Sequence, residues 1–201
     1  MQEIKPSSFI FEIEHALTPE TCREMIRRFE DKRDQQYPGR IGQGADREQS
    51  VKRSTDLRIS GRPDWKDIDT ALVQSLMRGF NEAAQKFPFF AANSFKDMGY
   101  NLQRTEPGEY YHWHVDGGPG PFSQRQLVAI WYLNDVPGPG GETEFSHQEI
   151  MSRRRPASLF YFHRFGPMCI GVLPSNRELN ILPPPGSASP DLAAPMAGAA
   201  R

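Results

Sequence analysis

The chain has little cysteine, and its cysteines are far apart. Cys22 and Cys169 are the two cysteines among 201 residues, and they form no CxxC pair. Small secreted folds without a large core depend on several disulfides, and structural zinc sites depend on closely spaced thiolates. The sequence therefore predicts neither a disulfide framework nor a zinc knuckle.

Long apolar runs and an excess of one charge are also missing. No stretch approaches the roughly 20 apolar residues of a membrane-spanning helix. The N-terminus "MQEIKPSSF" lacks the basic and then apolar pattern of a signal peptide. The 24 basic and 25 acidic residues give a net charge of -1, with no long basic stripe. We expect a cytoplasmic protein with no membrane or nucleic-acid partner.

Two helices are predicted in the first half of the chain, after a strand in "SFIFEIEHAL". The first helix lies within residues 17–36, where Thr18 is a good N-cap and Met25, Ile26 and Phe29 form an apolar face. The second lies within residues 64–87. Its apolar residues recur at helical spacing: Ile68, Leu72, Val73, Leu76, Met77 and Phe80. The polar, glycine-bearing residues 37–55 predict a loop between them.

From residue 98 the apolar period changes to two. "MGYNLQR", "EYYHWHV", "RQLVAIWYLNDV" and "ETEF" are short, aromatic or β-branched, and separated by Gly/Pro turns. Helices followed by many short strands indicate an α+β fold with an antiparallel sandwich or barrel. Residues 183–201 are rich in Pro, Ala, Gly and Ser, a composition typical of a disordered tail.

Within "GEYYHWHVDGG", His112, His114 and Asp116 stand on alternate positions. Residues two apart in a strand point to the same face, so His114 and Asp116 are expected to project together. With a second histidine from elsewhere, they would form a 2-His-1-carboxylate triad, which holds Fe(II) on one face and leaves three positions open. His112 is predicted to share that face, so His112 and His114 are an alternative pair.

The run "PGEYYHWHVDGG…RQLVAIWYLNDVPGPGGETEF" resembles the prolyl 4-hydroxylase-like branch of the Fe(II)/2-oxoglutarate-dependent oxygenases. The resemblance is close over residues ~98 to 150, because four separated elements occur in the family's order. It implies a double-stranded β-helix (jelly roll) with the N-terminal helices packed on it, spanning residues 1–182.

The same resemblance implies His114 and Asp116 as metal ligands, and Tyr111 and Tyr132 as residues of the 2-oxoglutarate pocket. Fe(II), 2-oxoglutarate and O2 would be the cofactors, with ascorbate as a further candidate. The implied reaction is hydroxylation of an unactivated C–H bond in a peptide or small molecule. For Tyr132, a core tyrosine with a satisfied hydroxyl is the competing interpretation.

After about residue 150 the chain departs from the family. The expected second histidine, in a segment like Trp-Thr-His-x-His-Arg-Gly, and the later basic residue of Lys-Tyr-Ile are both missing. Yet back-translation of "FGPMCIG", residues 165–171, in a shifted frame admits Trp-Thr-His-Val-His-Arg. The same operation on residues 179–187 admits Lys-Tyr-Ile-x-x-x-Trp-Leu. We interpret the segment after about residue 150 as a frameshifted version of the family's ending.

The alternative is a divergent member in which His163 is the third ligand and Arg177 binds the 2-oxoglutarate carboxylate. If the late strands are replaced, residues 127–134 are expected to lose apolar cover, and the chain is expected to hold Fe(II) weakly. Two other functions are compatible with the sequence. One is a cupin-like metal-binding module without oxygenase chemistry, and the other is an interaction domain with surface histidines.

Overall fold

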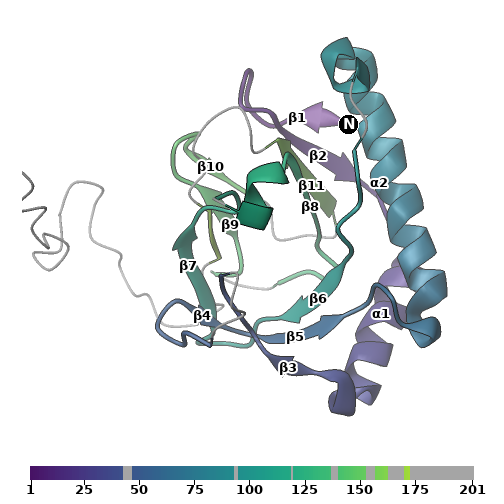
Figure 1. Cartoon of the computed structure of the whole chain (residues 1–201), viewed down its shortest axis with the longest axis vertical. Coiled ribbons are helices and arrows are strands. Elements are labelled where there is room, and N and C mark those ends of the chain that lie inside the picture. Colours follow the sequence, from purple (N-terminus) through teal and green to yellow (C-terminus); the bar gives the residue numbers. More distant parts are fainter. Residues whose placement is uncertain are drawn as a thin grey trace, which may run out of the picture.

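The computed structural model describes residues 1–42, 47–92, 95–118, 120–136, 140–152, 157–162 and 170–172. Two helices pack against three antiparallel sheets (Figure 1). The helices are α1 (Pro19–Asp31) and α2 (Lys66–Lys86), with 3-10 turns at Arg33–Gln35, Pro63–Trp65, Pro88–Ala92 and Gly120–Gln124. The coarse prediction of an α+β fold is confirmed.

The first sheet has the order β1-β2-β11-β8 and the second has the order β10-β9-β12-β7-β4. A third sheet, β3-β5-β6, lies beneath them in Figure 1. The bounds are β1 Gln2–Glu3, β2 Ile10–Glu14, β3 Tyr37–Pro38, β4 Lys52–Arg53, β5 Thr55–Arg58, β6 Asn101–Arg104, β7 Tyr110–His114, β8 Leu127–Trp131, β9 Thr143–Phe145, β10 Ile150–Met151, β11 Ala157–Phe162 and β12 Ile170–Val172.

The predicted strands at residues 8–17, 98–104, 109–115, 125–136 and 142–145 are confirmed as β2, β6, β7, β8 and β9. The loop predicted over residues 37–55 is wrong in part, because β3 and β4 lie within it and β5 begins at its end. These strands are only two to four residues long, too short for a periodic pattern to reveal them.

Strand β8 shows how the layers pack. Leu127, Ala129 and Trp131 pack with the cluster that contains Ala83 of α2. Val128 and Ile130 point the other way and pack with the cluster around Phe145 of β9. Alternate side chains of one strand therefore join the helix layer to the second sheet, as expected for a strand buried on both faces.

Late strands still pair with early ones. Strand β11 lies between β2 and β8, with Leu159 opposite both Glu12 and Ile130. Residues 127–131 thus have β11 as a backbone neighbour, and the loss of apolar cover over residues 127–134 stays a prediction. The predicted tail, residues 183–201, and the end of the predicted domain at 182 lie outside the described residues.

Helix α1 begins as its sequence predicts. The Thr18 side chain accepts a hydrogen bond from the Thr21 backbone N–H at 3.2 Å, and Pro19 occupies the first helical position, where its missing N–H costs nothing. Met25 and Phe29 are buried, but Ile26 is 36% exposed. Including Ile26 in the core face was therefore wrong.

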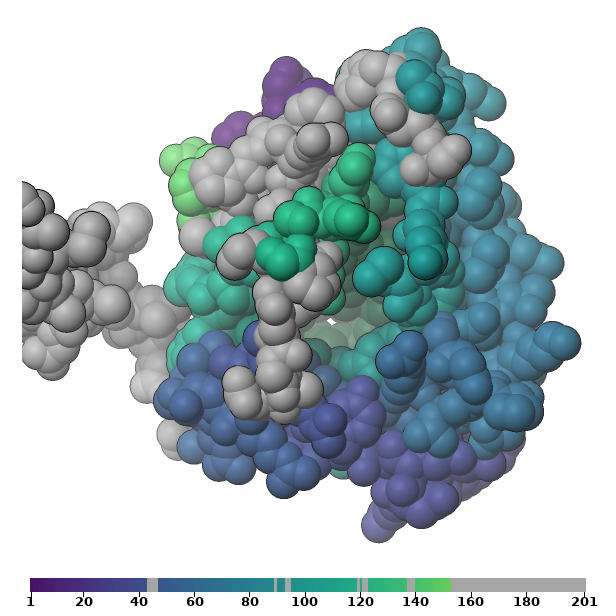
Figure 2. All heavy atoms as spheres, in the orientation of Figure 1, coloured from purple at the N-terminus to yellow at the C-terminus, as the bar shows by residue number. Residues whose placement is uncertain are grey.

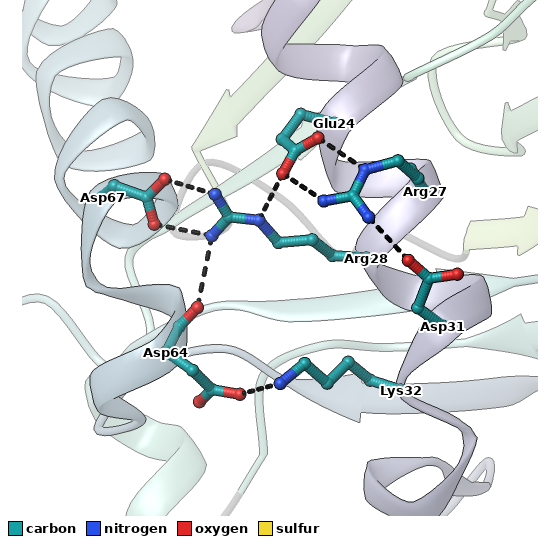
Figure 3. Close-up of polar contacts among 7 residues, drawn as sticks. All are labelled: Glu24, Arg27, Arg28, Asp31, Lys32, Asp64 and Asp67. Atoms are coloured by element: carbon teal, nitrogen blue, oxygen red, sulfur yellow. Dashed lines mark hydrogen bonds and ion pairs between the residues drawn. The ribbon is translucent and has the colours of Figure 1, made fainter.

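An ion network joins α1 to the start of α2 (Figure 3). The Arg28 guanidinium donates to both carboxylate oxygens of Asp67, each at 2.7 Å, and its Nε donates to Glu24. Lys32 pairs with Asp64 at 2.8 Å. Hydrogen bonds from Arg27 and Arg28 lower the pKa of Glu24 to about 2. The two-pronged Arg28–Asp67 contact ties α1 to the first turn of α2.

The buried face of α2 is narrower than predicted. It consists of Ile68, Leu72, Ser75, Gly79 and Ala83. The predicted Val73 and Met77 are 37% and 49% exposed. Ser75 is on the buried face because its hydroxyl accepts a hydrogen bond from the Trp131 indole at 2.9 Å. No helix in the described ranges is both long and apolar enough to cross a bilayer.

Leu72→Ala should lower the free energy of unfolding by about 2–5 kcal/mol, because its side chain is 2% exposed and truncation leaves a cavity. The neighbouring Val73→Ala is the matched control and should change it by less than about 0.5 kcal/mol. Urea denaturation of both variants measures the difference. An equal loss of unfolding free energy in the two variants would show that α2 does not bury the face that carries Leu72.

Candidate metal centre

The candidate site lies on β7, whose neighbours are β4 and β12. Opposite β12 the register is irregular: Val172 pairs with Tyr111 and Ile170 pairs with His114. Two steps along β12 thus oppose three steps along β7. One extra residue on β7 makes a β-bulge, which turns the following side chains relative to the preceding ones.

The bulge decides which side chains of β7 come together. The ring of His114 stacks on Tyr111, with centroids 3.6 Å apart and planes 10° apart. His112 is exposed, and its ring lies 4.3 Å from the ring of Tyr110. Because Tyr110 and Tyr111 are consecutive strand residues, they point to opposite faces. The structure thus separates the rings of His112 and His114, since strict alternation does not hold across a bulge, and the alternative His112/His114 ligand pair stays a prediction that this geometry disfavours.

His114 and Asp116 converge. Nε2 of His114 lies 3.5 Å from Oδ1 of Asp116, and their side chains are 15% and 18% exposed. Nδ1 of His114 lies 2.8 Å from the backbone oxygen of His112. A carbonyl oxygen only accepts, so Nδ1 is the donor of this contact and Nε2 is the ring nitrogen that faces Asp116. Metal-binding histidines typically use one ring nitrogen for such a hydrogen bond, which orients the ring, and the other nitrogen for the metal.

Two neighbours shape the surroundings of this pair. Burial, followed by the negative charge of Asp116, raises the pKa of Tyr111 to about 12, so its phenol stays neutral. Arg125 is exposed and donates from Nη1 to the backbone oxygen of Asp116 at 3.2 Å. The positive charge of Arg125 lowers the pKa of the Tyr111 phenol, whereas the negative charge of Asp116 raises it. Arg125 therefore places a cation at the edge of the site.

Tyr132 is in a different environment. Its hydroxyl lies 2.7 Å from Thr143 Oγ1 and 3.1 Å from Ser152 Oγ, and the Ser152 hydroxyl also accepts from the Thr143 backbone N–H. Burial raises the pKa of the Tyr132 phenol. The ring packs with the cluster between the two larger sheets. In this structure Tyr132 is a core tyrosine with a satisfied hydroxyl, and its role toward 2-oxoglutarate stays a prediction.

The third ligand is not found among the described residues, in which no group of three His, Cys, Asp or Glu side chains is placed to hold a metal ion. His147 is in the turn between β9 and β10. His163 and Arg177, the two residues of the divergent-member alternative, lie outside the described residues. The described part of the chain thus supplies one imidazole and one carboxylate.

A buried ion pair next to Tyr111 was missed by the sequence reasoning. Lys52 Nζ is 2.9 Å from Asp56 Oδ2 and 5.0 Å from the centre of the Tyr111 ring, and Ser54 donates to Asp56 at 2.8 Å. The Lys52 and Asp56 side chains are 7% and 5% exposed. The signal was in the sequence, because Lys52, Ser54 and Asp56 alternate along "VKRSTD" and so share a face.

The cluster is tightly enclosed at Gly39. A methyl group at this position would lie 2.2 Å from Ser54 Oγ and 3.0 Å from Lys52 Cε. Such distances are far inside van der Waals contact, so only glycine fits here without moving the buried ion pair. The backbone at Gly39 thereby closes one side of the pocket that holds Lys52 against Tyr111.

Lys52→Met should destabilise the fold by about 3–5 kcal/mol, because Asp56 would keep a buried charge without its cation. Lys52→Met/Asp56→Leu removes both charges and should be more stable than the single variant. Arg53→Met, at the adjacent exposed position, is the matched control. Thermal and urea unfolding measure the stability of the single variant, the double variant and the control. A single variant no less stable than the control would mean that the ion pair is not buried in solution.

Comparisons with known proteins match this geometry at the level of the fold. The sequence matches no protein-family profile, and no curated protein is detectably similar to it. Solved structures do match. A Pseudomonas putida prolyl-4-hydroxylase superposes with a TM-score of 0.62 at 18% identity, covering 85% of this chain and 88% of that one.

Two further matches are prolyl hydroxylases with bound molecules. The viral collagen prolyl hydroxylase of Paramecium bursaria Chlorella virus-1, in its 2OG complex, gives a TM-score of 0.59 at 16% identity and covers 86% of this chain and 91% of that one. A Trichoplax adhaerens prolyl hydroxylase, in complex with a hypoxia inducible factor peptide fragment, gives a TM-score of 0.65 at 12% identity. The match covers 84% of this chain and 78% of that one. The chain therefore has a prolyl hydroxylase-like fold.

Proposed function

We propose that His114 and Asp116 are two ligands of an Fe(II) centre, and that the chain descends from a 2-oxoglutarate-dependent dioxygenase. The observation that carries this proposal is the 3.5 Å separation of His114 Nε2 and Asp116 Oδ1. Metal–ligand bonds of about 2.1 Å place adjacent ligands of an octahedron about 3 Å apart. A small side-chain rotation is enough to bring both atoms onto one ion.

The surroundings of the pair support the same function. One imidazole nitrogen and one carboxylate oxygen are the donor types of a 2-His-1-carboxylate site, which leaves positions free for other molecules. When bound, Fe(II) with 2-oxoglutarate and O2 would supply the oxidising chemistry for hydroxylating an unactivated C–H bond. Tyr111, neutral and stacked on His114, limits the ring's rotation and keeps water off one side of it.

The finer fold assignment belongs to the same proposal. A jelly roll brings strands from both ends of a domain into one sheet. Here β7 lies between β4 and β12, and β12 lies between β7 and β9. That order supports a double-stranded β-helix in which a late strand stands beside the ligand-bearing one. The third ligand would come from the segment outside the described residues, either as His163 or from the restored reading frame.

The substrate proposed is a peptide or small molecule. The Trichoplax adhaerens neighbour is in complex with a peptide fragment, which makes a peptide the first class to examine. A metal-binding module without oxygenase chemistry is the competing function. Its ligand pair, His112 and His114, is disfavoured because the bulge separates the two rings.

Metal binding tests the assignment of the two ligands. His114→Ala and Asp116→Ala should each weaken Mn(II) binding by more than about tenfold, because each removes a direct ligand. His112→Ala and His147→Ala are matched controls and should bind as the unchanged chain does. Calorimetry and the metal-induced rise in melting temperature measure this. Tighter Mn(II) binding with 2-oxoglutarate supports the oxygenase site, and its absence the simpler module. Loss of binding in His112→Ala would refute the ligand assignment.

The reading frame is tested separately. We expect the 201-residue chain to release little succinate from 2-oxoglutarate in the presence of Fe(II), because two ligands hold the metal far less well than three. A version whose frame is restored after about residue 150 should bind Fe(II) more tightly and release succinate faster. Equal and rapid succinate release by both proteins would contradict the frameshift interpretation, as would a DNA sequence unable to encode the two missing segments.

A further inference from the structure

A concave region lies between β3 and β4. It is a groove of about 660 Å³, a size typical of ligand-binding pockets. Its cationic wall is formed by Arg33, Arg47 and Arg53, and Tyr37 and Glu109 also line it. We call this region the arginine groove. In Figure 1 it corresponds to the lower part of the molecule, where β3 and β4 are labelled.

The face shown in Figure 2 is hollowed near its centre, and blue and purple segments form its lower border. Strand β3 ends the β3-β5-β6 sheet, and β4 ends the sheet that contains β7. Between them, the Gly39 backbone N–H donates a hydrogen bond to the Ser54 backbone oxygen at 2.8 Å, so the chain itself closes this line. The groove therefore offers a ligand its side chains rather than open strand edges.

The charges of the groove are not balanced internally. Within the described residues, no carboxylate forms an ion pair with Arg33, Arg47 or Arg53, and all three side chains are exposed. The carboxylate of Glu109 accepts a hydrogen bond from the Glu106 backbone N–H at 2.8 Å. The fourth cation, Lys52, is paired with Asp56. Three arginines thus face the groove against one carboxylate that already has a partner.

Arg53 is placed to make a two-pronged contact with an anionic group such as a carboxylate. Its guanidinium lies 5.5 Å from the centre of the Tyr110 ring. An arginine stacked by its face keeps its N–H edge available for a two-pronged contact with a carboxylate. The wall carrying Arg53 is also fixed, because the Tyr110 hydroxyl donates to the Gln49 backbone oxygen at 3.0 Å.

We propose that the arginine groove binds an acidic peptide, through carboxylates paired with Arg33, Arg47 and Arg53. Lys52 lines the groove and also lies over Tyr111, whose ring stacks on His114. A peptide held there is anchored close to the candidate metal centre. That this peptide is the substrate rests on the function proposed above, whereas the binding itself requires no metal.

Binding of a labelled peptide tests the groove with the full chain and without metal. A fluorescein-labelled 12-residue peptide with four glutamates should bind more tightly than the same peptide with four glutamines, as measured by anisotropy. Arg33→Gln/Arg47→Gln should weaken binding by about tenfold or more, because two charge-assisted contacts are lost. No hydrogen bond or ion pair of either side chain is seen within the described residues, and both side chains are exposed, so folding should be unchanged, which melting temperature checks.

Arg23→Gln/Lys66→Gln removes the same charge from exposed positions outside the groove and should bind within about twofold of the unchanged chain. Arg33→Glu/Arg47→Glu should lose the acidic peptide and gain affinity for a peptide with four lysines. Three results would overturn the proposal: no preference for glutamate, an equal loss in both glutamine variants, or equal competition by a single-stranded oligonucleotide. Because no metal is present, failure here leaves the Mn(II) result at His114 and Asp116 to stand or fall separately.

Discussion

The β-bulge in β7 is the constraint on which the candidate site depends. Three steps along β7 oppose two along β12 between Tyr111 and His114. This extra residue puts the imidazole of His114 on the face of Tyr111 and leaves His112 exposed beside Tyr110. Without the bulge, strict alternation would place both histidines on one face. The bulge thus separates His114 from His112, and the His114 imidazole lies beside the Asp116 carboxylate.

The strands around β7 hold this geometry in place. On one side β12 sets the register, and on the other β4 presents Lys52, which is buried against Tyr111 and paired with Asp56. A buried charge pair is a costly way to stabilise a fold, but it fixes geometry because both partners must stay together. Tyr111 is therefore held between a cation on one side and the ring of His114 on the other.

The two candidate sites of the chain fit one arrangement. Strand β7 carries His114, and Asp116 follows it after one residue, while Arg33, Arg47 and Arg53 come from a 3-10 turn, a loop and the short strand β4. Binding residues placed on short elements beside a rigid scaffold can vary without loss of the core.

By itself the sequence determined the long periodic elements. Both helices and the strands β2 and β6–β9 followed from apolar periodicity, because burial selects such patterns locally. Spacing and the family resemblance together made His114 and Asp116 the candidate ligands. Tertiary structure decided the rest. The exposure of His112, the burial of Lys52 and the place of Tyr132 in the core depend on which strand lies opposite, and pairing between residues as distant as Tyr111 and Val172 leaves no mark on either segment alone.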